Sequence, residues 1–139
     1  MLRYSVFSLI VFFLCSCSSP SRHESLVLLA RILEVEHSLV QERVQVISEV
    51  SGGFTDYYAK YLVRVQPNSF QKLLSGRYFE VVDCSQYASN KNWYEGLAEA
   101  RPFEIATCYA HGVHTEKGGA VVIYVNTNGE NGLINYYDG

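Results

Sequence analysis

The chain has little hydrophobic sequence of the kind that crosses a bilayer. Residues 6–14 form an apolar stretch that is broken only by Ser8. A membrane-spanning helix needs about 20 apolar residues, so this stretch is too short to remain as a transmembrane helix. A short apolar core behind a basic residue, here Arg3, is instead typical of an export signal.

The sequence also lacks the short motifs that mark many enzymes. It contains no G-x-S-x-G nucleophile motif, no H-E-x-x-H zinc motif and no glycine-rich phosphate loop. Internal repeats and low-complexity tracts are missing as well. We therefore expect a protein that is not an enzyme and that needs no cofactor.

Positive charge is scarce. Lys and Arg number 11 against 14 Asp and Glu, which gives a net charge of −3. Nucleic acids and anionic lipid surfaces are bound by concentrated positive charge. The composition therefore argues against nucleic acid, or anionic lipid, as the main partner.

The apolar stretch ends in the motif Leu14-Cys15-Ser16-Cys17. This motif resembles the lipobox of bacterial lipoproteins, with Leu14 at the third position before Cys17. The resemblance implies that residues 1–16 are cleaved as a signal peptide, that Cys17 carries diacylglycerol, and that its new amino group is acylated, for example by palmitate. Two or three acyl chains hold a protein stably on a membrane.

The same resemblance implies a place in the bacterial cell envelope, anchored by lipid, with the periplasmic side of the outer membrane favoured. An ordinary cleaved signal and an uncleaved anchor stay open as alternatives. Residues 17–23, which include the polar run S-S-P-S-R, form the expected tether. Residues 24–139 have the length of one domain with a single modest core.

The expected fold is α+β. From Glu24, apolar residues recur every three or four positions as far as His37, which predicts a long N-terminal helix packed on one face of a sheet. Alternating or extended patterns predict a sheet of about five or six antiparallel strands. They lie at residues 44–46, 57–65, 77–83, 103–110, 120–125 and 133–137. A short helix is expected after the second of them, with Phe70, Leu73 and Leu74 on its buried face.

The middle of the chain carries a second, weaker likeness. Residues 50–58 read V-S-G-G-F-T-D-Y-Y, and residues 65–76 read V-Q-P-N-S-F-Q-K-L-L-S-G. This layout of strand, turn, strand and short helix resembles that of small uncharacterised bacterial lipoproteins. The resemblance implies a fold but no mechanism.

Two cysteines follow the lipobox, Cys84 and Cys108. Thiols of exported proteins oxidise, so we expect these two to form a disulfide. Closing a loop of about 25 residues stabilises a fold by roughly 3–3.5 kcal/mol in the chain-entropy model.

An alternative is a metal-binding or thiol-dependent enzyme built on Cys108, His111 and His114. Their C-x2-H-x2-H spacing supplies thiolate and imidazole, which are good ligands for zinc or copper. In an extended strand, however, His111 points away from the face shared by the other two side chains. The simpler interpretation is a strand end with solvated histidines, and we predict no metal site.

Aromatic residues are abundant, with 11 Tyr and 1 Trp. Neighbours in a strand point to opposite faces, so pairs such as Tyr57 and Tyr58 cannot both be buried on one side. Exposed tyrosines provide apolar contact area and a hydroxyl at low entropic cost. We therefore predict a non-enzymatic binding or accessory module for an envelope protein or a cell-wall glycan. Its expected contact residues are Tyr58, Trp93, Tyr94 and Tyr137.

Overall fold

The computed structural model describes residues 21–53, 56–74, 79–88, 96–97, 103–113 and 119–138. The lipobox with Cys17, and the tether up to Pro20, lie outside these residues. The expectations about export, cleavage and acylation therefore stay predictions.

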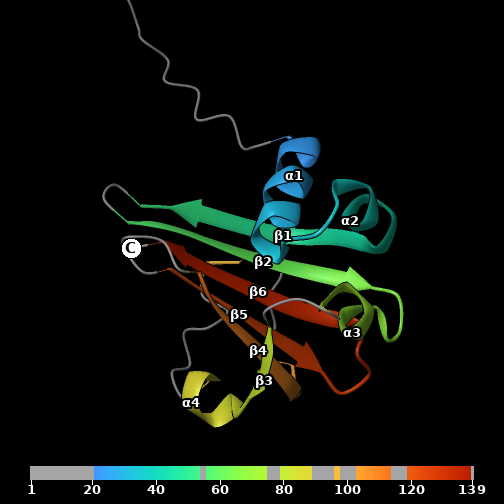
Figure 1. The fold of residues 1–139 in the computed structure, drawn as a ribbon, viewed down its shortest axis with the longest axis vertical. Coiled ribbons are helices and arrows are strands. Elements are labelled where there is room, and N and C mark those ends of the chain that lie inside the picture. The colour runs from blue at the N-terminus through green and yellow to red at the C-terminus, as the bar shows by residue number, and fades with distance from the viewer. Residues whose placement is uncertain are drawn as a thin grey trace, which may run out of the picture.

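One antiparallel sheet of six strands organises the described part of the chain (Figure 1). The strand order is β1-β2-β6-β5-β4-β3, so the last strand of the chain lies in the middle of the sheet. This confirms the antiparallel sheet of an α+β fold. The strands are β1 (Val44–Gly52), β2 (Tyr57–Val65), β3 (Glu80–Val82), β4 (Ile105–Val113), β5 (Gly119–Asn126) and β6 (Asn131–Asp138).

Helix α1 (Arg22–Leu33) begins with a capping box. The Glu24 backbone N–H donates to the Ser21 hydroxyl at 3.3 Å, and the Ser21 N–H donates to the Glu24 carboxylate at 3.0 Å. These bonds satisfy two of the free N–H groups at the helix start. The helix therefore begins at Arg22, ahead of the first apolar position that the periodicity shows.

The single long helix expected from residue 24 to His37 is wrong. Helix α1 ends at Leu33, because Glu34 adopts the left-handed conformation (φ 56°, ψ 41°) and its N–H bonds back to Ala30 and Arg31. A second helix, α2 (His37–Arg43), then leads directly into β1. Apolar residues continue across this break, so periodicity alone does not show it.

Two more short helices follow later in the chain. Helix α3 (Ser69–Leu74) follows β2, as expected, and buries Phe70, Leu73 and Leu74. Helix α4 (Cys84–Ala88) follows β3 and contacts β4. Asp83 caps the first turn of α4: its carboxylate accepts a 3.0 Å hydrogen bond from the Ser85 backbone N–H.

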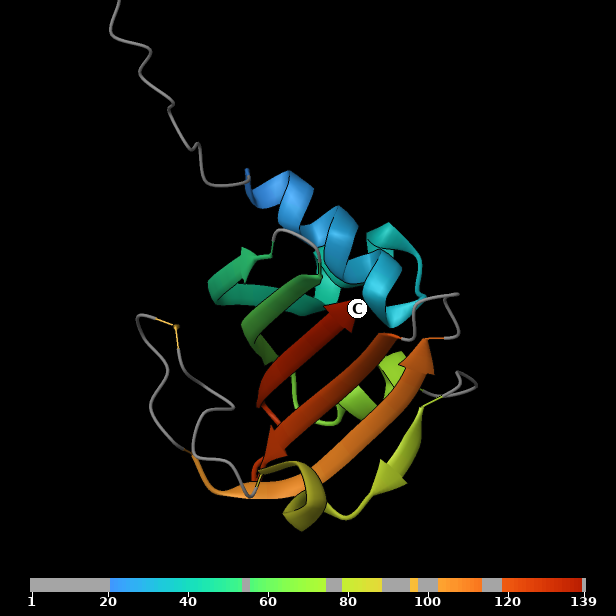
Figure 2. The same ribbon diagram turned by 90° about the vertical axis from the view of Figure 1, so that its left-hand side faces the viewer.

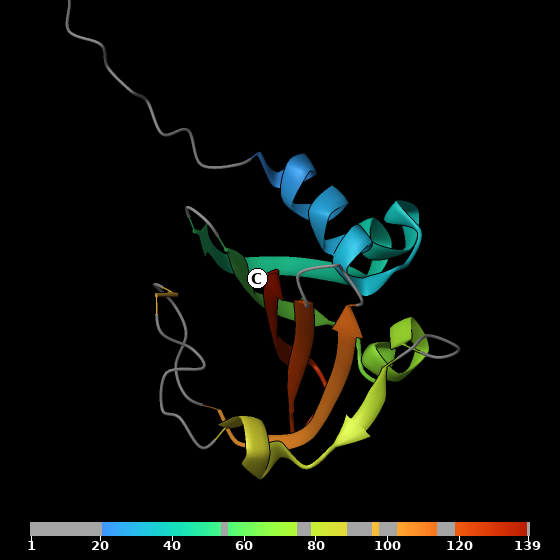
Figure 3. The same ribbon diagram turned by 60° about the vertical axis from the view of Figure 1, so that its left-hand side comes forward.

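The main core lies between one face of the sheet and helices α1, α2 and α3. Figures 2 and 3 show α1 and α2 side by side above this face. Alternate residues of each strand enter this core, such as Ala59, Tyr61 and Val63 in β2 and Val121, Ile123 and Val125 in β5. The helical residues come mainly from α1 and α3.

The opposite face of the sheet carries a smaller buried cluster. It consists of Leu97, Cys108, Tyr124 and Leu133, with Val50, Leu62, Val82, Cys84, Phe103, Ile105 and Val122 packed around it. Leu97 covers part of this face from a segment outside the sheet. No helix of the main core contributes to this cluster, so the two faces differ in what covers them.

Candidate functional site

Tyr58 of β2 and Tyr137 of β6 stand directly opposite each other in the antiparallel register. Their exposed fractions are 40% and 49%. Their neighbours Ala59 and Tyr136 pack against the helix-covered core, so alternation places Tyr58 and Tyr137 on the opposite face. The structure therefore brings together two of the four predicted contact residues as one exposed pair.

The ring of Tyr58 lies over the backbone of Gly52 in β1. A Cβ atom at position 52 would be 2.9 Å from the Tyr58 hydroxyl oxygen and 3.1 Å from Cε1 and Cζ. Only a residue without a side chain leaves room for the ring in this place. Gly52 thus defines where the Tyr58 ring rests on the sheet.

Asp56 lies beside the phenol group of Tyr137. The negative charge of Asp56 raises the pKa of the Tyr137 phenol, and the hydrogen bond that the phenol donates to the Asp56 carboxylate raises it further. Asp56 immediately precedes β2, so the contact joins the start of β2 to the end of β6. The Tyr137 phenol therefore has a polar neighbour in Asp56, whereas the Tyr58 ring rests over the backbone of Gly52.

A cleft of about 440 Å³ opens beside the Tyr58 ring, with Val50, Lys60 and Gly96 as further lining residues. Val50 and Lys60 are opposite each other in the register and share a face with Tyr58. Gly96 approaches from outside the sheet, since a Cβ there would be 3.5 Å from a Val50 methyl carbon. The cleft combines an aromatic wall, an aliphatic wall and an ammonium group.

The other two predicted contact residues, Trp93 and Tyr94, lie outside the described residues. Sequence reasoning missed Gly52, Asp56 and Gly96. The glycines and aspartate between the first two strands were visible as turn residues. Their contacts with the two rings depend on strand pairing, which the sequence does not display.

The predicted disulfide between Cys84 and Cys108 is present, with Cα atoms 5.3 Å apart. It joins α4 to β4 within the smaller buried cluster. Both thiols are consumed by this bond, so neither is available here as a nucleophile or as a metal ligand.

His111 lies on the other face of β4 from Cys108. Its ring contacts the Phe79 ring at a centroid distance of 5.3 Å, and its Nε2 is 3.7 Å from a Glu34 carboxylate oxygen. His114 lies outside the described residues. Among the residues that the structure places, no three His, Cys, Asp or Glu side chains form a group suited to a metal ion. The Cys108 and His111 side chains do not converge.

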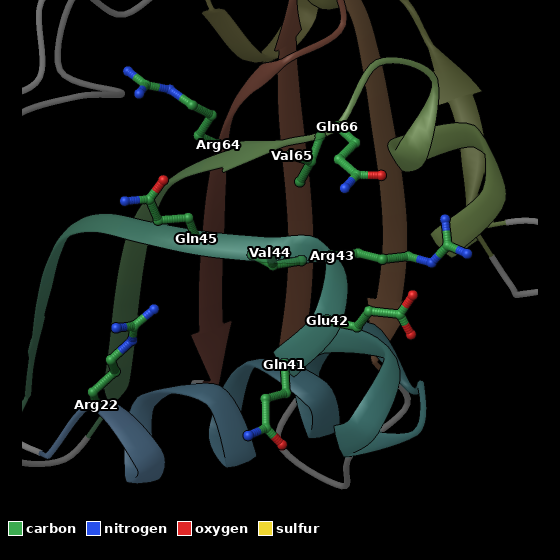
Figure 4. A pocket seen from close by; sticks show the side chains of 9 residues that line it. All are labelled: Arg22, Gln41, Glu42, Arg43, Val44, Gln45, Arg64, Val65 and Gln66. Atoms are coloured by element: carbon green, nitrogen blue, oxygen red, sulfur yellow. The ribbon is translucent and has the colours of Figure 1, made fainter.

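Three arginines, Arg22, Arg43 and Arg64, line a groove of about 380 Å³ where α2 passes into β1. Figure 4 shows Arg43 extended on the side of Glu42, away from Arg22 and Arg64. The guanidinium groups therefore do not surround one point, as a tightly bound phosphate would require. We assign no anion site to this groove.

Comparison with family models, curated proteins and solved structures found no match for this chain. Within the residues that the structure describes, none of the helices has both the length and the apolar character to cross a membrane.

Proposed function

We propose that this chain is a lipid-anchored protein of the bacterial cell envelope that acts as a non-enzymatic binding module. The lipobox-like motif Leu14-Cys15-Ser16-Cys17 supports the anchor, with Cys17 as the acylated residue. The resemblance to bacterial lipoproteins favours the outer membrane as the site of the anchor, with the folded module on the periplasmic side. Its partner is an envelope protein or a cell-wall glycan.

The exposed pair of Tyr58 and Tyr137 is the observation that supports binding. A tyrosine side chain has only two rotatable bonds, so these large exposed rings lose little conformational freedom when a partner covers them. The thiols of Cys84 and Cys108 are bonded to each other, which favours a binding role over thiol chemistry.

The short tether places this module close to the bilayer. Helix α1 begins at Arg22, so residues 18–21 separate the acylated Cys17 from the helix. The five Cα-to-Cα steps from Cys17 to Arg22 span at most ~18 Å when fully extended. A partner of this protein therefore lies at or near the membrane surface.

Acylation is tested by growing cells with radiolabelled palmitate and following the full chain. The label is expected in the wild type and in the Cys15→Ser variant, and both should fractionate with membranes. The Cys17→Ser variant should lose the label and leave the membrane fraction. Membrane fractionation of Cys17→Ser that matches the wild type, without label in either protein, would overturn the anchor.

Binding is tested in cells by replacing Tyr137 with a photo-crosslinking amino acid and identifying the products by mass spectrometry. Position 57 serves as the matched control, because Tyr57 is 37% exposed but lies on the helix-covered side, where its ring contacts Tyr136. Products specific to position 137 are expected. Identical products, or none, at the two positions would contradict a binding role for this face.

A further inference from the structure

We propose that the Tyr58–Tyr137 face binds the glycan strand of the cell wall, with sugar rings stacked on the two tyrosines. This inference rests on the proposed binding function and names the class of its ligand. It starts from the chemistry of the face, which combines flat apolar surfaces with polar groups at their edges.

A pyranose ring has the matching character. Its faces carry C–H groups that pack on an aromatic ring, and its rim carries hydroxyl groups that form hydrogen bonds. Tyr58 and Tyr137 supply two neighbouring aromatic faces on adjacent strands, about 4.8 Å apart in the hydrogen-bonding direction. Lys60, which is paired with Asn135 in the register, lies on the same face and lines the cleft beside Tyr58.

The cleft beside Tyr58 favours a chain of N-acetylated sugars. Its volume of about 440 Å³ lies within the roughly 300–1,000 Å³ of small-ligand sites. The Val50 side chain supplies an aliphatic wall next to the ring. An acetamido group offers a methyl group to such a wall and an amide to the polar rim.

The face fits a protein partner less well. On this side of the sheet, the large apolar side chains that the structure describes as exposed are Tyr58 and Tyr137. A stable protein interface buries about 800 Å² on each partner around a central apolar cluster. Two tyrosines flanked by charged groups provide little of such a cluster.

The charge of the chain and of Asp56 limits which glycans this face can bind. The chain has a net charge of −3, and Asp56 stands at the edge of the Tyr137 ring. At the Tyr137 end of the face, this carboxylate would repel a phosphate-rich polysaccharide. The cell-wall glycan strand, with uncharged amide groups on its sugars, avoids that repulsion.

The test uses the full chain purified in detergent. The probes are a soluble tetramer of N-acetylglucosamine, measured by calorimetry, and purified cell-wall sacculi, measured by co-sedimentation. Lipopolysaccharide is the comparison probe. We expect the wild type to bind the tetramer and the sacculi in preference to lipopolysaccharide.

Tyr58→Ala and Tyr137→Ala should each weaken binding about tenfold, as loss of a central aromatic contact does. Tyr58→Phe keeps the ring and should stay within about twofold of the wild type. Tyr57→Ala is the matched control on the other face and should bind as the wild type does. Urea unfolding of each variant verifies that the fold is retained.

The outcomes separate this inference from the proposed function. Wild-type protein that binds neither tetramer nor sacculi, but forms a protein crosslink specific to position 137, overturns the glycan and leaves the binding module intact. Preference for lipopolysaccharide overturns the cell-wall source. Equal glycan binding by the wild type and both alanine variants overturns the assignment to this face.

Discussion

The ring of Phe70 in α3 lies directly on Gly132 in β6. A Cβ atom at position 132 would be 2.8 Å from Phe70 Cε2. Both residues are buried, and Phe70 belongs to the main core. The contact joins the short helix after β2 to the strand that pairs with β2.

Gly132→Ala should therefore destabilise the protein. The added methyl group meets a ring that the core holds, and overpacking of this kind costs about 1–3 kcal/mol. Urea unfolding measures the change. Adding Phe70→Leu should recover part of the loss, because the two substitutions relieve the same clash. Fully additive effects would contradict direct contact between the side chains.

Gly52→Ala makes the corresponding change on the exposed face. Its methyl group would meet the outer end of the Tyr58 ring, which is free to move into solvent. We expect stability to change by less than about 1 kcal/mol while glycan binding falls as it does in Tyr58→Ala. Calorimetry and urea unfolding on one preparation measure both. Unchanged binding would show that the position of the ring does not matter.

Breaking the disulfide should lower stability substantially. Replacing Cys84 and Cys108 with Ala removes a cross-link over 24 residues, which is worth roughly 3 kcal/mol in the chain-entropy model. Reduction of the wild type should give a similar shift in the unfolding midpoint. Thiol titration of the unreduced, unfolded wild type should find no reactive thiol at Cys84 or Cys108. Reactive thiols at both positions would exclude the disulfide.

Alkaline pH should destabilise the fold through Tyr61. Burial raises the pKa of this phenol, and Tyr57 and Glu49 raise it further. The unfolded chain, with a tyrosine pKa of about 10, loses the proton first. The stabilisation is therefore complete below about pH 10 and is lost as the pH rises beyond it.

Urea unfolding between about pH 8 and about pH 11 measures this effect. Tyr61→Phe cannot ionise, so its stability should fall less steeply with pH. Some decline should persist, because burial also raises the pKa of Tyr136. A decline as steep as that of the wild type would mean that Tyr61 does not control it.

The strands were the part of the fold that the sequence predicted best. The alternation from Tyr57 to Val65 predicted β2 with its boundaries, because one face is buried and the other is half exposed. The first strand was less readable. The pairing of β1 with β2 shifts between Val46 and Ser48, and this irregularity interrupts the alternation. Strand β1 therefore extends to Gly52, well past the three residues that the pattern indicated.

For the candidate site, the sequence predicted only which residue types take part and not how they are arranged. The opposed directions of Tyr57 and Tyr58 follow from strand geometry, and the structure confirms them. The pairing of Tyr58 with Tyr137 joins residues far apart in the chain. It exists because β6 inserts between β2 and β5, and no local pattern encodes that order.

The sequence by itself determined the alternating strands, the short helix after β2 and the two cysteines available for a disulfide, because each depends on local spacing or residue chemistry. Only the tertiary structure decided the strand order, the break after Leu33 and the surface that Tyr58 and Tyr137 form together. These features depend on long-range pairing and on the left-handed backbone conformation of Glu34. A glutamate does not by itself predict that conformation.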